Sequence, residues 1–224
     1  MKICLLIHGL NTKDGGGRFS FDLVSNLKST GQEIQVLTNL DLLKNPIINI
    51  FKIRKIFKNS DIIHAVDIWP NGFYARLISF GLKKPIIITD SGELRPWRTP
   101  MQLSDIFGTT LYRVIDNPWL GPFQYPLRPW FYRTKSDLIR KVFAPQNQKT
   151  IISEFQAEPW AMQPLTEIPI KEQLSKFPIS RLQETVDFAR KTGFPEAYFW
   201  GVEWWYYLAK NDHPEYLNYA KTLF

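Results

Sequence analysis

Three consecutive glycines stand where an anionic group could be bound. Gly15, Gly16 and Gly17 follow an apolar run at residues 2–7 and precede a helical pattern. Glycine lets backbone N–H groups come close to an anion at the N-terminus of a helix. A plain flexible turn would have the same sequence, so both interpretations stay open. His64, which ends a later apolar run, is a further candidate for substrate binding, with a purely structural role as its alternative.

A second candidate site is basic. Residues 47–58 place isoleucine and phenylalanine on one face of a predicted helix, and four cations occupy the other positions, Lys52, Arg54, Lys55 and Lys58. A basic amphipathic helix can bind an anionic membrane surface. The alternative is a surface helix with a solvated charged side. Nucleic-acid binding is not predicted, because no aromatic platform or recognised module accompanies the charge.

The elements that would position these residues alternate between strand and helix. Residues 2–7 and 33–38 are predicted strands, and Gly31 ends the helix between them. The remaining elements of this half are predicted strands at 61–66 and 85–90 and a helix at 71–80. This order is typical of a doubly wound, Rossmann-like α/β sheet.

Two runs of this half carry a family resemblance, GGGRFSFDLVSNLKSTGQEIQVLTN and SDIIHAVDIWPNGFYARLISFGLKKPIIIT. They are similar to the N-terminal domain of family 4 glycosyltransferases of the GT-B type. The resemblance implies that Gly15–Gly17 approach substrate in a cleft and that the donor is a nucleotide sugar; no other cofactor and no metal is predicted. In this family the donor sits mainly on a C-terminal domain, and nothing after residue 90 resembles one.

The composition changes after Thr89. Seven of the eight tryptophans lie beyond residue 90, and the net charge is +6 over residues 1–89 but +1 over residues 90–224. The elements of this half are predicted strands at 105–112, 149–154 and 197–203, helices at 136–143 and 181–192, and a proline-rich loop at 118–129. Such a shift is what a junction between unlike units produces.

Four phrases carry a second resemblance, TDSGELRPW, DIFGTTLYR, IISEFQAEPW and YFWGVEWWYYL. They are similar to strands five to eight of the (β/α)8 barrels of glycoside hydrolase clan A. The resemblance implies that Glu154 is the nucleophile of a retaining glycosidase and that Tyr112 and Arg113 orient it or the substrate. It also implies a sugar-stacking wall of Trp160, Trp200, Trp204 and Trp205. Packing in the core is the alternative for these tryptophans.

A retaining glycosidase needs a second carboxyl group about 5–5.5 Å from the nucleophile. In the clan this acid/base follows an asparagine, and the sequence contains no Asn-Glu pair. The substitutes that the sequence offers are Glu93, Glu158 and Glu203. Glu203, like Glu154, is predicted at the carboxyl end of a strand, where barrel active sites lie. The alternative for Glu154 is an inherited carboxylate without turnover.

Composition also bears on compartment and assembly. The single cysteine, Cys4, excludes an internal disulfide, and no apolar stretch is long enough to span a bilayer. The sequence therefore predicts a cytoplasmic protein, peripheral at the inner membrane face if the basic helix binds lipid. A half barrel left alone would expose apolar faces, so a homo-oligomer is the alternative to one composite sheet.

The predicted fold class is α/β, a parallel sheet with flanking helices. A Rossmann-like unit at 1–89 joins a half (β/α)8 barrel at 85–224 through a shared strand at 85–90. The predicted function is that of a carbohydrate-active protein, similar to the acceptor-side domain of a glycosyltransferase, with a carbohydrate or nucleotide sugar as ligand. Two alternatives stay open: a glycoside hydrolase-like half barrel that acts through Glu154, and a non-catalytic sugar-binding or vestigial hybrid.

Overall fold

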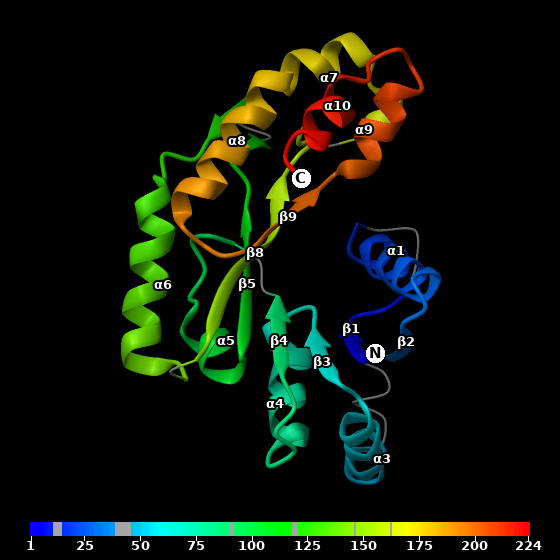
Figure 1. The fold of residues 1–224 in the computed structure, drawn as a ribbon, viewed down its shortest axis with the longest axis vertical. Helices are drawn as coiled ribbons and strands as arrows, with labels where there is room; N and C mark the ends of the chain where they lie inside the picture. Colours follow the sequence, from blue (N-terminus) through cyan, green and yellow to red (C-terminus); the bar gives the residue numbers. More distant parts are fainter. Residues whose placement is uncertain (11–14, 39–45, 90–91, 118–120, 146, 162) are drawn as a thin grey trace. The chain divides into compact units, whose positions relative to one another are not determined.

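The structure of the protein is a computed structural model, which describes residues 1–10, 15–38, 46–89, 92–117, 121–145, 147–161 and 163–224. The chain forms two compact units (Figure 1). Unit 1 contains residues 1–109 and 136–150, and unit 2 contains residues 110–135 and 151–224. The boundary predicted at residues 85–90 separates two sequence patterns and not two compact units, so it stays a prediction.

The strands confirm the predicted class, a parallel sheet with flanking helices. A seven-stranded sheet has the order β2-β1-β3-β4-β5-β8-β9. The pairs β1–β2, β1–β3, β3–β4, β4–β5 and β8–β9 are all parallel. Two of its strands, β5 (Ile106–Leu111) and β8 (Lys149–Gln156), contribute residues to both units.

Unit 1 begins with the strand–helix alternation that the sequence predicts. Its elements are β1 (Lys2–Ile7), α1 (Gly15–Ser29), β2 (Glu33–Thr38), α3 (Pro46–Asn59), β3 (Ile62–Ala65), a π-helical turn at Ile68–Gly72, α4 (Phe73–Ser79), β4 (Ile86–Thr89) and α5 (Arg98–Leu103). One detail differs from the prediction. α1 begins at Gly15, so the three glycines form its first turn rather than a turn before it.

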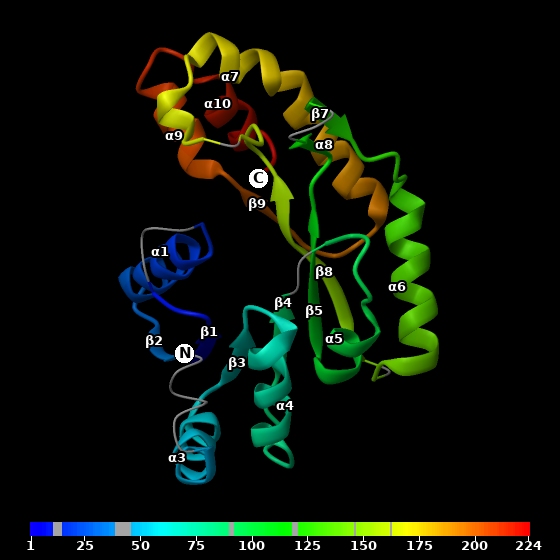
Figure 2. The ribbon, with the colours of Figure 1, turned by 180° about the vertical axis from the view of Figure 1, so that it is seen from behind.

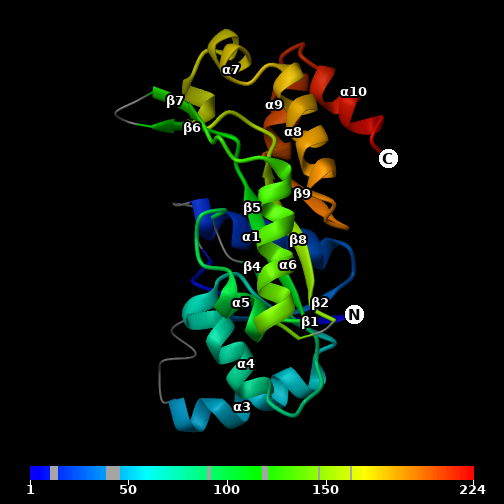
Figure 3. The ribbon, with the colours of Figure 1, turned by 90° about the vertical axis from the view of Figure 1, so that its left-hand side faces the viewer.

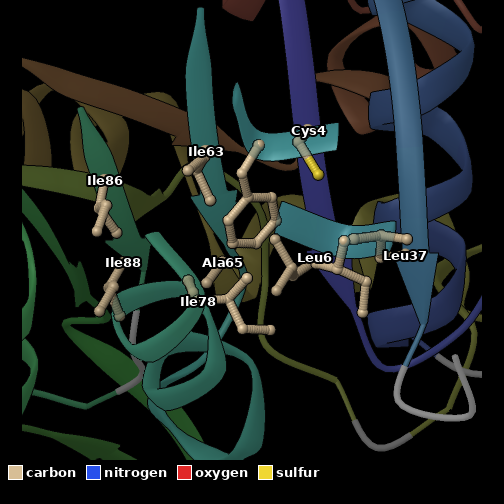
Figure 4. Packing of buried hydrophobic residues seen from close by; sticks show 11 residues of the cluster. Cys4, Leu6, Leu37, Ile63, Ala65, Ile78, Ile86 and Ile88 are labelled. Carbon is tan, nitrogen blue, oxygen red and sulfur yellow. The ribbon is translucent and has the colours of Figure 1, made fainter. Parts of the chain in front are cut away.

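The core of unit 1 lies on both faces of its sheet. Successive side chains of a strand point to opposite faces, so Cys4 and Leu6 of β1 face α3 and α4, while Leu5 and Ile7 face α1. Figure 4 shows Cys4 and Leu6 within a cluster of buried side chains from neighbouring strands and helices. Val24 of α1 packs on the opposite side. Helices therefore cover both faces of the sheet at its first strands.

Unit 2 contains a hairpin, several helices and the end of the sheet. Its elements are β6 (Val114–Asn117), β7 (Gly121–Gln124), α7 (Ile170–Lys176), α8 (Ile179–Thr192), β9 (Ala197–Trp200), α9 (Val202–Ala209) and α10 (Glu215–Lys221). α6 (Pro129–Phe143) begins in unit 2 and ends in unit 1. β9 pairs with β8, and α10 packs against α8 and α9 (Figure 2).

Two predictions about unit 2 need correction. β6 and β7 form an antiparallel hairpin (Figure 3), whereas the sequence predicts a loop over residues 118–129, of which 118–120 lie outside the described ranges. β9 ends at Trp200, short of the predicted residue 203, because Gly201 has a left-handed φ of +96° and α9 begins at the next residue. Glu203 thus lies in a helix and not at the end of a strand.

Candidate functional sites

The last part of β8 in unit 2 brings Glu154, Tyr112 and Trp160 together. The Tyr112 hydroxyl donates a hydrogen bond to Glu154 Oε2 at 3.2 Å. The Trp160 ring packs against the Tyr112 ring at a steep angle, with their centroids 5.3 Å apart. Trp160 keeps 43% of its surface exposed. A phenol, a carboxyl group and an exposed indole are thus gathered in one place, a combination that can hold a sugar through its hydroxyls and its ring face.

Burial changes the proton affinity of the Glu154 carboxyl group. Desolvation raises the pKa of Glu154, while the hydrogen bond from Tyr112 favours the ionised form and lowers it. Desolvation is the larger effect. Glu154 is therefore a fixed carboxyl group that is more basic than a glutamate in water.

Glu158, two residues beyond β8, is a second perturbed carboxyl group. Burial and, to a lesser extent, the charge of Glu203 raise its pKa, a hydrogen bond from Trp200 lowers it, and the net result is a pKa of about 7. Gly201 packs tightly here, because a Cβ at this position would lie 2.4 Å from Glu158 Cγ. Near neutral pH Glu158 exists in both protonation states, which suits a general acid or base.

The other residues predicted for this site take different positions. Glu203 is exposed in the first turn of α9 and acts on Glu158 through its charge. Arg113 stacks on the Phe188 ring, with Cζ 4.0 Å from the ring centroid, and desolvation lowers its pKa. Glu93 is buried and belongs to unit 1. Within the described residues, Tyr112 is thus the predicted partner that forms a hydrogen bond with Glu154.

Trp204 and Trp205 are each 2% exposed. Trp204 Nε1 donates to Gln173 Oε1 at 2.6 Å, and Trp205 Nε1 donates to the Ala157 carbonyl at 2.7 Å. With both rings and both N–H groups engaged inside the protein, these positions favour core packing, the alternative that the sequence left open.

A small hollow of about 40 Å³ lies beside Trp160 and Phe177. It has room for about one water molecule. A pyranose ring is larger than this hollow, so a sugar at this site would lie on the exposed face of Trp160.

The carboxyl ends of β1 and β3 in unit 1 hold a pair of residues that is not among those predicted from the sequence. His8 Nε2 lies 2.7 Å from Asp67 Oδ2, and Asn71 Nδ2 donates to the same oxygen at 2.7 Å. The side chain of His8 is 62% exposed and that of Asp67 17%. A carboxylate fixed by an amide thus orients an imidazole that faces solvent, an arrangement suited to a general base.

A sequence signal for this pair exists. His8 comes directly after β1, Asp67 comes shortly after β3, and these two strands are neighbours in the sheet. The carboxyl ends of neighbouring parallel strands meet at one edge, where ligands of open α/β sheets bind. Polar residues that directly follow two neighbouring parallel strands therefore predict one common site, but only when the strand order is known.

His64 lies inside β3 and not at the end of a strand. Its Nε2 is 3.3 Å from Thr89 Oγ1 on the adjacent β4, and burial lowers its pKa to about 4. The imidazole is therefore neutral at pH 7, and these contacts favour the structural role. Gly15–Gly17 present the N-terminus of α1, where free N–H groups attract anions. Anion binding there stays a prediction, and residues 11–14 lie outside the described ranges.

The basic helix forms as predicted, as α3. Arg54 is engaged within unit 1, because its Nη1 donates to the Ile78 carbonyl at 2.6 Å. Lys52, Lys55 and Lys58 are exposed. None of the helices in the described ranges has the length and apolar character that crossing a membrane requires. Membrane association through α3 would thus depend on three lysines and stays a prediction.

Comparison with known proteins identifies no family for this chain. No family model matches it, and no curated protein matches it. Among solved structures, a periplasmic solute-binding protein of an ABC transporter from Actinobacillus succinogenes 130z, with bound D-allose, is similar over 89% of this chain at 13% identity and a TM-score of 0.30. The chain spans 57% of that protein's length. A TM-score this low bears on neither fold nor ligand.

Proposed function

We propose that the protein binds carbohydrate at the end of β8 in unit 2. The observation that carries the proposal is the hydrogen bond of 3.2 Å from Tyr112 to Glu154, next to the half-exposed ring of Trp160. The resemblance of this segment to glycoside hydrolases of clan A supports the same ligand class. In the bound state the exposed face of Trp160 stacks on a sugar ring, and Glu154 accepts hydrogen bonds from sugar hydroxyls.

Hydrolysis of a glycosidic bond is the finer form of this proposal. In it Glu154 attacks the anomeric carbon while Glu158 protonates the leaving oxygen, since a pKa of about 7 keeps part of Glu158 protonated near neutral pH. A water molecule that gives its proton to Glu158 then releases the sugar from Glu154. Binding without turnover is the simpler form. The two forms share one sugar site and differ in whether product is released.

Titration calorimetry with a panel of oligosaccharides tests the binding site. Trp160→Ala and Glu154→Gln should each weaken binding about tenfold or more, which corresponds to about 1.4 kcal/mol. Matched controls are Trp130→Ala, which removes another exposed tryptophan of unit 2, and Glu167→Gln, which changes an exposed glutamate. Both controls should bind as the wild type does. Equal losses in the site variants and the controls would refute the site, as would a panel in which no sugar binds.

Chromogenic aryl glycosides test the hydrolytic form in the same preparations. Glu154→Gln should abolish turnover, and Glu158→Gln should slow substrates with poor leaving groups most, because these depend on proton donation. Turnover that survives Glu154→Gln would remove the nucleophile assignment, while sugar binding without turnover would select the simpler form.

A second candidate function, the acceptor side of a glycosyltransferase, is favoured by the His8–Asp67 contact of 2.7 Å in unit 1. His8 would take the proton of an acceptor hydroxyl, and the N-terminus of α1 would face a phosphate group. Adding lipid-linked sugar acceptors to the titration panel tests it. His8→Gln should reduce acceptor binding and leave oligosaccharide binding at β8 unchanged; an unaltered affinity for the acceptor would exclude this candidate.

A further inference from the structure

β2 is one of the two edge strands of the sheet and pairs with β1 alone in the described part of the chain. A groove of about 600 Å³ lies between β2 and α3. It is lined by residues 33–36 of β2, by Lys2 and Ile3 of β1, and by residues of α3 and just after its end that include Lys52 and Lys55. An edge strand beside a groove is a template for pairing with another chain.

The backbone of β2 determines which groups face outward. The Glu33 N–H donates to the Met1 carbonyl at 3.0 Å, so the backbone groups of Glu33 turn toward β1. Along a strand successive residues direct these groups to opposite edges, so the N–H and C=O groups of Ile34 and Val36 point away from β1. Both residues line the groove. The free edge thus offers evenly spaced donors and acceptors to an extended segment.

The charge around the groove selects the side chains of that segment. Lys52 and Lys55 line it from α3 and are exposed, and Lys2 at its end pairs with Glu33 at 3.2 Å. α3 packs on the face of the sheet that carries Cys4 and Leu6, so both lysines lie on that side of β2. Ile34 and Val36 direct their side chains to the opposite face. Acidic side chains therefore fit one face of an added strand, and apolar side chains fit the other.

We propose that the free edge of β2 binds an extended acidic segment of a partner protein as an added strand. Main-chain hydrogen bonds to Ile34 and Val36 hold the segment, and its alternate acidic side chains face Lys52 and Lys55. A second copy of this chain is a poorer occupant, because pairing two β2 edges would bring the lysines of two α3 helices together.

Fluorescence anisotropy with labelled hexapeptides tests the proposal. The probe alternates glutamate with valine, and the comparison peptide alternates lysine with valine. The full chain should bind the glutamate peptide and bind the lysine peptide at least about tenfold more weakly. Val36→Pro removes an N–H that points outward and keeps the charge, so it tests strand addition itself. Lys55→Glu tests the charge, and Lys58→Glu is its matched control, because Lys58 is exposed on α3 but does not line the groove.

Val36→Pro and Lys55→Glu should each weaken glutamate-peptide binding about tenfold or more, and Lys58→Glu should leave it within about twofold of the wild type. If Val36→Pro fails to fold, Ile34→Pro replaces it, because this substitution also removes a backbone N–H that points away from β1. Binding that survives the proline substitutions but not Lys55→Glu would mean charge attraction without an added strand, and would overturn the proposal. Equal binding of both peptides would overturn it too, as would sedimentation showing a dimer that Val36→Pro dissociates.

Discussion

Single residues in this protein owe their chemistry to neighbours that come from distant parts of the sequence. Glu158 has a pKa of about 7 because it is buried and lies near the charge of Glu203. Glu154 becomes a fixed carboxyl group through Tyr112, 42 positions away. The sequence could point to Glu154 and Tyr112 through strand ends and a resemblance. It could not assign Trp204 and Trp205 to the core, because that depends on which N–H groups find partners inside.

His64 gives a prediction at this scale. Its pKa is about 4 in the folded protein and 6.5 in its ordinary state, so the unfolded chain binds the proton more tightly. The free energy of unfolding should therefore fall as the pH decreases from about 6.5 to about 4, by about 3 kcal/mol from this residue. His64→Asn should flatten that part of the profile in urea unfolding measured at several pH values. His213→Asn, which changes a histidine of unit 2, is the control; a wild-type slope retained in His64→Asn would contradict the assignment.

Elements were predictable where local patterns and turn residues agree. α8 ends where Gly193 takes a left-handed φ of +71°, and β1 and β2 have their predicted bounds. The prediction was wrong where a distant contact decides the structure. β9 ends early at Gly201, which has a left-handed φ and packs against Glu158, and β6 exchanges hydrogen bonds with the side chain of Gln156 on β8, a strand that follows it in the chain.

Gln156 gives a prediction for that hairpin. Gln156 is 1% exposed. Its Oε1 accepts hydrogen bonds from the backbone N–H groups of Arg113 and Val114 at 3.1 and 2.9 Å. Its Nε2 donates to the Val114 carbonyl at 2.7 Å. Gln156→Ala would remove the partners of these partly buried backbone groups and should lower the free energy of unfolding by about 1–2 kcal/mol. Hydrogen exchange of residues 114–117 should accelerate. The exposed Gln183→Ala is the control, and unchanged exchange in Gln156→Ala would show that the hairpin is held by other contacts.

At the scale of the whole molecule, the sequence predicted the class of fold better than the details of its sites. Apolar runs, glycines and helix patterns were enough to anticipate a parallel sheet with helices on its faces, which the strand order confirms. The His8–Asp67 pair needed that strand order before it could be recognised. Each unit carries a candidate site of its own, so variants at β8 and at His8 should act on different ligands.

A crystal of the protein soaked with the tightest-binding oligosaccharide shows whether a sugar binds at Glu154 and Trp160. We expect density for a sugar ring stacked on the exposed face of Trp160, with a hydroxyl within hydrogen-bonding distance of Glu154. Density for the sugar at another place, with Trp160 and Glu154 free in a saturated crystal, would contradict it.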